Sequence, residues 1–357
     1  MNDLELQLHY PLGDALPESG RCLEVAPGVK WIRMGLPFAL NHINLWLLRD
    51  DMDGRAGWSI VDCCIHKDEA KAQWESVFAN ELDGLPVLRV IVTHMHPDHI
   101  GLAHWLCQRW NAPLWISALD YQVAKWGCLG PTAFGGERAA DFFALHGLND
   151  PETIRQIRAR TNYFPSLVPS VPEDYHRLLD GKVFDIGGRS WRCISGYGHA
   201  PEHMALYCDG LNVLIGGDMM LPRISTNVSV YEQEPEANSL VLFLNSIDKF
   251  KSLPEDTLVL PSHGKPFTGL HTRIQQLHEH HRDRLAEVMD ACSARPSSAA
   301  DIIPVLFKRP MDLHQITFAI GESIAHLHAL WFDKQLVRSL GPDGVLRFAS
   351  LGLAASA

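Results

Sequence analysis

Histidine and aspartate side chains are concentrated in one short segment that directly follows an apolar run. Residues 93–101 read Thr-His-Met-His-Pro-Asp-His-Ile-Gly, which is a His-x-His-x-Asp-His pattern. Imidazole nitrogens and carboxylate oxygens are the ligands that Zn²⁺ and related divalent ions take in proteins. Chance rarely produces this pattern, even in a chain with 19 histidines, so we interpret it as a metal site and not as a solvated loop. Its candidate ligands are His94, His96, Asp98 and His99.

Three later segments each carry a further candidate ligand just past a predicted strand. These ligands are His199 in Gly196-Tyr-Gly-His-Ala-Pro-Glu-His203, Asp218 in Ile215-Gly-Gly-Asp and His263 in Pro261-Ser-His-Gly-Lys265. Each of them comes where a strand gives way to a loop. One edge of a sheet can therefore bring all of them to the segment at 93–101.

The elements expected to position these residues begin as strands and then alternate with helices. Apolar runs near residues 31–34, 43–48 and 58–62 are separated by Gly, Pro and Asp turns, which is typical of consecutive antiparallel strands. Apolar residues at helical spacing predict a helix over 67–80. A continuous apolar run at 86–93 predicts a buried strand, and 101–110 predicts another helix. This order favours an α/β layered fold.

The remaining sequence predicts an insertion and a C-terminal tail. Aromatic residues and helical patterns replace the strand pattern over about 117–175, which indicates a largely helical insertion. A long amphipathic helix is predicted from about Thr268 to Ala291. A Ser/Ala/Pro linker, two helical patterns and a hairpin follow it. We therefore predict a catalytic domain over 1–267, and a long helix plus a winged-helix-like domain over 268–357.

Composition excludes several classes of protein. The chain has 357 residues, is 46% hydrophobic and carries a formal net charge of −11. No apolar run approaches the roughly 18–20 residues that span a bilayer, and no secretory signal is visible. The eight cysteines form no CxxC pair, so we expect reduced thiols in a cytoplasmic protein. The acidic balance argues against nucleic acid as a partner, because binding phosphates requires basic patches.

Taken in order, these motifs resemble the metallo-β-lactamase-fold hydrolases, and the resemblance extends over roughly residues 30–265. It implies an αββα sandwich with a binuclear metal site at one edge of its two sheets. Asp62 matches the acid with which that family orients a ligand histidine. An ordinary turn residue is the alternative for Asp62. By the resemblance, the first metal ion is held by His94, His96 and His199, the second by Asp98, His99 and His263, and both by a bridging Asp218.

The ligand set predicts the chemistry. Two divalent ions that share a water lower its pKa toward about 7 and supply hydroxide at neutral pH. That hydroxide would attack an acyl or phosphoryl centre. Asp98 is a candidate to relay a proton to the leaving group, and Tyr197 is a candidate oxyanion donor. We take Zn²⁺ as the default metal, with iron or manganese as alternatives for the same ligands.

Several other residues have both a functional and a structural interpretation. His203 is expected to pack or hydrogen-bond beneath the site. His42 could reach the pocket rim, although a structural role is favoured. For His278 and His281 we favour a solvated helix face over a metal cluster, because no distant partner ligand is evident. Arg223 could bind a substrate anion, but a surface or salt-bridge role is favoured.

Differences between this sequence and known branches of the family indicate the substrate class. True β-lactamases lack the bridging acid that Asp218 supplies, which disfavours antibiotic hydrolysis. Met219 and Met220 follow Asp218, where acyl-homoserine lactonases carry a tyrosine. The segment after His263 does not match the glutathione site of glyoxalase II. We therefore predict a hydrolase of an ester or thioester with an apolar acyl part, contributed by a small-molecule substrate.

An RNA nuclease is the first alternative, and a lactonase is the second. The charges of the tail beyond Pro296 balance, which favours a packing or homodimer module over a nucleic-acid clamp.

Overall fold

The structure is a computed structural model that describes residues 4–130 and 135–354. Within them the chain forms two compact units. The first unit comprises residues up to 129, 164–226 and 246–274, and the second comprises 130–163, 227–245 and the residues from 275 onward. No helix in the described part of the chain is long and apolar enough to cross a membrane.

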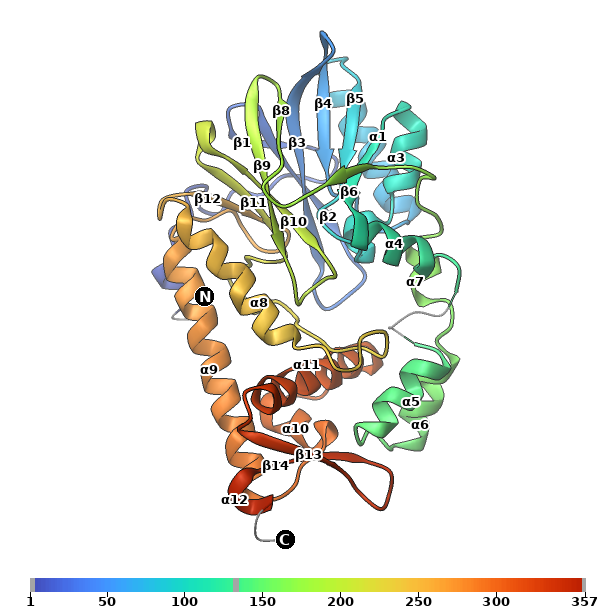
Figure 1. Ribbon diagram of the computed structural model, residues 1–357. Helices are drawn as coiled ribbons and strands as arrows, with labels where there is room; N and C mark the ends of the chain where they lie inside the picture. Colours follow the sequence, from blue (N-terminus) through green and yellow to red (C-terminus); the bar gives the residue numbers. More distant parts are fainter. Residues whose placement is uncertain (1–3, 131–134, 355–357) are drawn as a thin grey trace. The chain divides into compact units, whose positions relative to one another are not determined.

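The larger sheet of the first unit has seven strands in sequence order (Figure 1). Strands β1 to β4 pair antiparallel, whereas β4 to β7 pair parallel. The predicted change from early hairpins to alternating strands and helices is therefore confirmed. The strands are β1 (Leu23–Ala26), β2 (Val29–Gly35), β3 (His42–Met52), β4 (Arg55–Val61), β5 (Val87–Ile91), β6 (Leu114–Ser117) and β7 (His176–Leu178).

The second sheet has five strands in the order β12-β11-β10-β9-β8. β11 and β12 run parallel, so both end at the same edge. The antiparallel pairings of β10 with β9 and β11 bring the end of β9 and the start of β10 to that edge as well. The strands are β8 (Val183–Ile186), β9 (Arg189–Gly196), β10 (His203–Cys208), β11 (Val213–Gly217) and β12 (Leu258–Pro261).

The core of the first unit lies between the two sheets. Trp31 and Trp46 stack at 6.2 Å between ring centroids, and they pack in one buried cluster with Trp191, Met204 and Ile215 of the other sheet. Burying a large apolar side chain stabilises a fold by roughly 1.5–3 kcal/mol. The side chains that face each other across the sheets therefore hold the sandwich closed, and the αββα sandwich expected from the sequence is confirmed.

Helices cover the outer side of the larger sheet, where α1, α3 and α4 lie beside its strands (Figure 1). In α1 the buried residues are Ala70, Trp74, Val77 and Phe78, which confirms the helical spacing read from the sequence. The helices and 3₁₀ turns assigned mainly to this unit are η1 (Glu5–Gln7), α1 (Asp68–Asn80), α2 (Pro97–Ile100), α3 (Ala103–Trp110), α4 (Ala118–Gly127), α7 (Tyr163–Leu167), η2 (Asp209–Leu211) and η3 (Lys249–Ser252).

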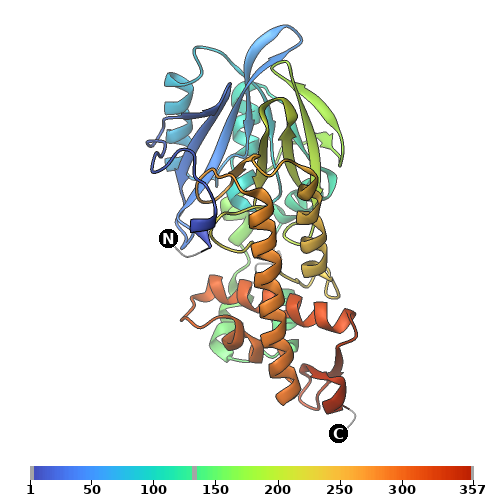
Figure 2. The ribbon, with the colours of Figure 1, turned by 90° about the vertical axis from the view of Figure 1, so that its left-hand side faces the viewer.

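The second unit contains two helices of the insertion, α5 and α6, and those of the C-terminal tail. Two helices, α8 and the long α9, continue from one unit into the other, and Figure 2 shows α9 as one continuous helix. A two-stranded hairpin follows α11. The assignment of this tail as a winged helix remains a prediction. The elements are α5 (Glu137–Leu145), α6 (Pro151–Ala159), α8 (Ser239–Asp248), α9 (Leu270–Ala294), α10 (Ala299–Leu306), α11 (Leu313–Phe332), β13 (Leu336–Leu340), β14 (Leu346–Ser350) and α12 (Leu351–Ala354).

Candidate metal centre

The loop after β5 presents its side chains by changing from extended to helical backbone. His96 is extended at the start of α2, and Pro97 occupies the first turn, where its fixed φ suits a helix. Gly101 ends this short turn. A Cβ at Gly101 would lie 2.6 Å from the carbonyl oxygen of Pro97 and 2.7 Å from that of Cys64, so only glycine fits. His96 therefore comes from extended backbone, and Asp98 and His99 from the helical turn.

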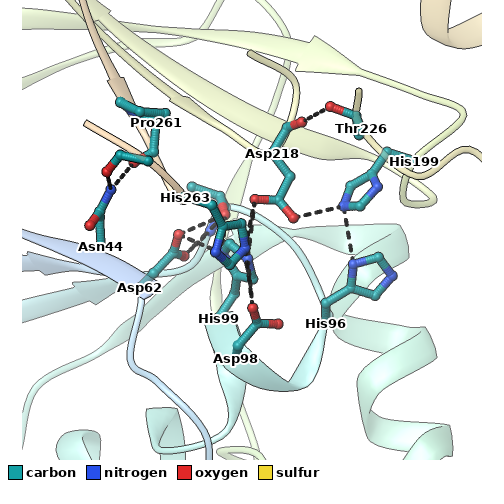
Figure 3. A network of polar contacts seen from close by, with 12 residues as sticks. Asn44, Asp62, His96, Asp98, His99, His199, Asp218, Thr226, Pro261 and His263 are labelled. Atoms are coloured by element: carbon teal, nitrogen blue, oxygen red, sulfur yellow. Dashed lines mark hydrogen bonds and ion pairs between the residues drawn. The ribbon is translucent and has the colours of Figure 1, made fainter. Parts of the chain in front are cut away.

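The second sheet supplies the other predicted ligands at its edge. His199 lies between β9 and β10, Asp218 directly follows β11, and His263 lies just past β12. Figure 3 shows these side chains turned toward those of the loop after β5. The structure thus brings together all seven residues that the sequence predicted as ligands. It places them in two groups, His94, His96, His199 and Asp218 in one, and Asp98, His99 and His263 in the other, with the ligand atoms of each group within 4.8 Å of one another.

Asp218, a member of the first group, turns one carboxylate oxygen toward the histidines of each group. Its Oδ2 is 3.2 Å from Nε2 of His199 and 3.9 Å from Nε2 of His94. Its Oδ1 is 3.6 Å from Nε2 of His99 and 3.5 Å from Nε2 of His263. From this position Asp218 would contact ions held by either group.

The donor atoms fit divalent ions. Nε2 of His94, Nδ1 of His96 and Nε2 of His199 lie 2.9–3.2 Å from one another. Nitrogens bound to one tetrahedral zinc ion at about 2.0–2.1 Å would be roughly 3.3 Å apart. Among the described residues, Nε2 of His99 and Oδ1 of Asp218 are buried without a hydrogen-bond partner. Such atoms are costly to leave unpaired, and an ion would compensate both.

Histidines of the two groups differ in the direction in which their surroundings shift the pKa. Burial and the neighbouring imidazoles lower the pKa of His94 well below its usual value, and burial lowers the pKa of His96 to about 3. Burial also opposes charge on His99, but surrounding carboxylates, Asp62 foremost, outweigh it and raise the pKa of His99. Desolvation opposes charge on the carboxyl of Asp98, yet His99 and His263 lower its pKa to about 2. His94 and His96 of the first group are therefore neutral imidazoles, whereas the second group contains the ionised carboxylate of Asp98.

Asp62 orients one ligand of the second group. Nδ1 of His99 donates to Oδ2 of Asp62 at 2.8 Å, which leaves Nε2 facing the centre. The backbone N–H of Thr93 donates to Oδ1 of Asp62 at 2.8 Å, and the Thr93 hydroxyl donates to both carboxylate oxygens. A carboxylate behind a ligand histidine fixes its tautomer and its ring orientation. Asp62 thus occupies the position that the family resemblance implied.

The start of β3 holds the other histidine of the second group. Nδ1 of His263 donates to the backbone carbonyl of His42 at 2.6 Å. Nε2 of His42 accepts from the N–H of Gly264 at 2.8 Å. Nδ2 of Asn44 donates to the carbonyls of Pro261 and Gly264 at 2.8 and 3.0 Å. These contacts assign His42 a structural role through its main chain, as favoured from the sequence.

Two supporting residues were missed by the sequence analysis, Asn44 and Asp120. Asn44 acts through main-chain carbonyls of a segment more than 200 positions away, so no sequence signal points to it. Asp120 follows Ser117 in a Ser-x-x-Asp pattern at the start of α4. That pattern indicates a helix N-cap and gives no hint of a second role.

The remaining candidates lie apart from the ligand atoms or beneath them. Nε2 of His203 accepts from the N–H of Asp218 at 3.3 Å, which places it beneath the site as interpreted. The Tyr197 ring lies beside Lys249, whose Nζ is 5.5 Å from the ring centroid, and its role as an oxyanion donor remains a prediction. Arg223 is largely exposed and lies 3.9 Å from a carboxylate oxygen of Glu5.

The interpretation of residues 278–281 as a solvated helix face is wrong for His281. This side chain is fully buried, and its Nδ1 lies 3.3 Å from Nε2 of His326 on α11. Its ring also packs edge-on against Phe243 of α8. His281 lies at helical spacing from Ile274, Leu277 and Val288, so it belongs to the buried face of α9.

A family model described as the metallo-beta-lactamase superfamily matches residues 40–263. The chain belongs to this superfamily. A second model, described as the metallo-beta-lactamase-like C-terminal domain, matches residues 285–351. The matched regions contain all the predicted ligands and most of the tail, so the resemblance read from the motifs is confirmed.

Individual relatives agree with this membership. The probable metallo-hydrolase YqjP of Bacillus subtilis (strain 168) is 24% identical over 316 residues, which cover 84% of this chain and 91% of YqjP. A crystal structure of a beta-lactamase domain protein from Burkholderia ambifaria shares 54% identity and a TM-score of 0.92, covering 98% of this chain and 100% of that one. A metallo-beta-lactamase family protein from Thermus thermophilus shares 27% identity and a TM-score of 0.74, covering 92% of this chain and 100% of that one.

Proposed function

We propose that this member of a metallo-hydrolase family is a binuclear hydrolase of esters or thioesters with an apolar acyl group. The observation that carries the proposal is Asp218, which turns Oδ2 toward His199 and Oδ1 toward His263, at 3.2 and 3.5 Å. A carboxylate shared in this way suits two ions acting on one substrate group. Two divalent ions would supply Lewis acidity to polarise the acyl carbonyl and to make a water acidic at neutral pH.

Asp98 is the residue that we assign to proton transfer. Its Oδ2 lies 3.4 Å from Nε2 of His263, and its side chain is 19% exposed, against 11% for Asp218. Its carboxylate is held ionised by the adjacent histidines, so it can accept a proton and pass it to a leaving group. Of the two histidines, His263 lies nearer to Oδ2 of Asp98, since Nε2 of His99 is 3.8 Å away.

The apolar acyl group is inferred from sequence features. The segment 117–175 is rich in aromatic residues, and the chain carries a net charge of −11. An apolar wall with few polar groups is typical of a small-molecule pocket, whereas an acidic chain binds a polyanion poorly. Zinc is the proposed metal, and the free thiols of all eight cysteines support a reducing compartment such as the cytoplasm.

A substrate panel tests this function. Purified protein loaded with Zn²⁺, Mn²⁺ or Fe²⁺ would be assayed on acyl thioesters of increasing chain length, p-nitrophenyl esters, lactones and single-stranded RNA. We expect turnover of the acyl substrates and its loss, by at least about 100-fold, in His96→Ala. The matched control is His176→Ala, which removes an exposed histidine that stacks on Trp115. RNA cleavage that is lost in Asp98→Ala, without turnover of any acyl substrate, would reject the proposal in favour of a nuclease.

A further inference from the structure

Asp120 is a fully buried carboxylate that contacts two loops of the metal centre without being one of the predicted ligands. Its Oδ1 accepts from the backbone N–H of Met95 at 2.7 Å. Its Oδ2 accepts from the backbone N–H of Glu202 at 2.6 Å. Met95 lies between His94 and His96, and Glu202 lies in the same β9–β10 loop as His199. One carboxylate therefore joins the loops that carry all three histidines of the first group.

Asp120 is also held by Ser117, the N-cap of its own helix. Asp120 lies in the first turn of α4, where its N–H donates to the Ser117 hydroxyl at 3.3 Å. The same hydroxyl donates to Oδ2 of Asp120 at 3.1 Å. No ion pair involving Asp120 occurs among the described residues. Burial raises the pKa of its carboxyl to about 6 even though the two backbone N–H groups favour the ion. Both oxygens are thus committed to the two loops, because a buried carboxylate needs its hydrogen bonds.

We propose that Asp120 is a positioning residue that sets the spacing of His94, His96 and His199 and thereby the metal affinity of the first group. This inference rests on the binuclear centre of the proposed function and not on its substrate. The histidines of the second group have other supports, since Asp62 orients His99 and the His42 carbonyl orients His263. Loss of the Asp120 carboxylate should therefore affect one metal ion far more than the other.

Asp120→Asn is the sharpest test, because asparagine keeps the shape of the side chain but has a single acceptor oxygen. Either Met95 or Glu202 must then lose its partner. The matched control is Asp185→Asn, which changes an exposed carboxylate that also accepts a backbone N–H, from Gly188 at 2.9 Å. Metal-free protein would be titrated with Co²⁺, and the visible absorption and bound equivalents would be measured.

We expect wild type and Asp185→Asn to bind two equivalents. Asp120→Asn should bind one equivalent about 10- to 100-fold more weakly, which is the usual effect of losing an outer partner of a metal ligand. Two backgrounds identify the affected site. In His263→Ala, which disables the second group, Asp120→Asn should weaken the remaining Co²⁺ by the same factor. In His96→Ala, which disables the first group, it should leave the remaining Co²⁺ unchanged.

Unchanged Co²⁺ affinity in Asp120→Asn, or an equal loss in both backgrounds, would overturn the proposal. If Asp120→Asn does not fold, Ser117→Ala replaces it, because it removes only the hydroxyl that orients Oδ2. That variant should then weaken only the first site, by about 2- to 5-fold, and an equal or absent effect would also overturn the proposal. Because the readout is Co²⁺ binding, a protein that binds two equivalents but hydrolyses no ester or thioester refutes the proposed function and leaves this inference standing. A wild type that binds no metal refutes both.

Discussion

The two ligand groups of the candidate metal centre both face the carboxylate of Asp218 but are built in different ways. In the first group, three imidazoles approach one another to 2.9–3.2 Å, and burial keeps His94 and His96 neutral. In the second group, carboxylates surround the histidines and raise the pKa of His99 and His263. The supports differ as well, since the second group uses Asp62 and the main chain of β3. The comparison indicates that a substitution can weaken one of two adjacent metal sites alone, unless it affects a residue that contacts both.

The largest effect is expected from Gly217→Ala, because this substitution displaces Asp218, whose carboxylate faces both groups. A Cβ at Gly217 would lie 2.1 Å from Nε2 of His203, and its φ of +55° disfavours any residue with a side chain. Asp218 follows directly, so both groups should lose their metal and hydrolysis should fall by more than about 100-fold. Bound metal and turnover measure this, with the exposed Gly210→Ala as the control, where a Cβ meets nothing within 4 Å. Retention of either ion would contradict a shared Asp218.

The next largest effect is expected from Asp62→Asn, which should affect the second group alone. The amide cannot accept from both Nδ1 of His99 and the N–H of Thr93, which now share the carboxylate. We expect the second Co²⁺ to bind about 10- to 100-fold more weakly while the first binds as in wild type. Titration of the metal-free variant checks this. Equal weakening of both ions would show that the groups are not separately supported.

Asn44→Ala should loosen only the loop that carries His263. The substitution removes the donor to the carbonyls of Pro261 and Gly264. Leaving buried carbonyls unpaired costs about 1–3 kcal/mol, so the unfolding free energy should fall by that amount and the second ion should bind more weakly. Chemical denaturation and Co²⁺ titration measure the two effects, with the exposed Asn80→Ala as the control. A variant with a weakened first ion would argue against the assignment.

Thr93→Val is expected to have the smallest effect and to spread it over both groups. The Thr93 hydroxyl donates to Asp62 and accepts from Nδ1 of His94 at 3.0 Å. Valine keeps the shape but loses these bonds, which are worth about 1 kcal/mol each. Each ion should therefore bind a few-fold more weakly, as followed by Co²⁺ titration. An effect confined to one ion would show that the hydroxyl serves that group alone.

Periodicity and motif spacing predicted most of the fold and the ligands because those signals are local. The spacing of Ala70, Trp74 and Val77 specifies a helix face whatever surrounds it. The motif at 94–99 brings its ligands together within one strand–loop–helix unit. The ends of β11 and β12 then bring in Asp218 and His263, because parallel strands end at the same edge.

The supports of the site could not be predicted because they depend on contacts between distant segments. The backbone N–H groups of Met95 and Glu202 that bind Asp120 are chemically the same as those of any residue. The partner of the His263 ring is likewise a main-chain carbonyl, that of His42. His281 was misplaced for another reason: its polar side chain was taken to be solvated, although it shares the spacing of the buried Ile274 and Leu277 on its own helix.

The ligands come from both sheets of the sandwich, and this has a consequence for motion. His94 to His99 follow β5 of the larger sheet, whereas Asp218 and His263 follow β11 and β12 of the smaller one. Ions held between them would tie the rims of the two sheets together, so the free energy of metal binding would also oppose sliding of one sheet over the other. Withdrawal of the metal should therefore speed amide hydrogen exchange first at this rim, while the tryptophan-rich interior stays protected.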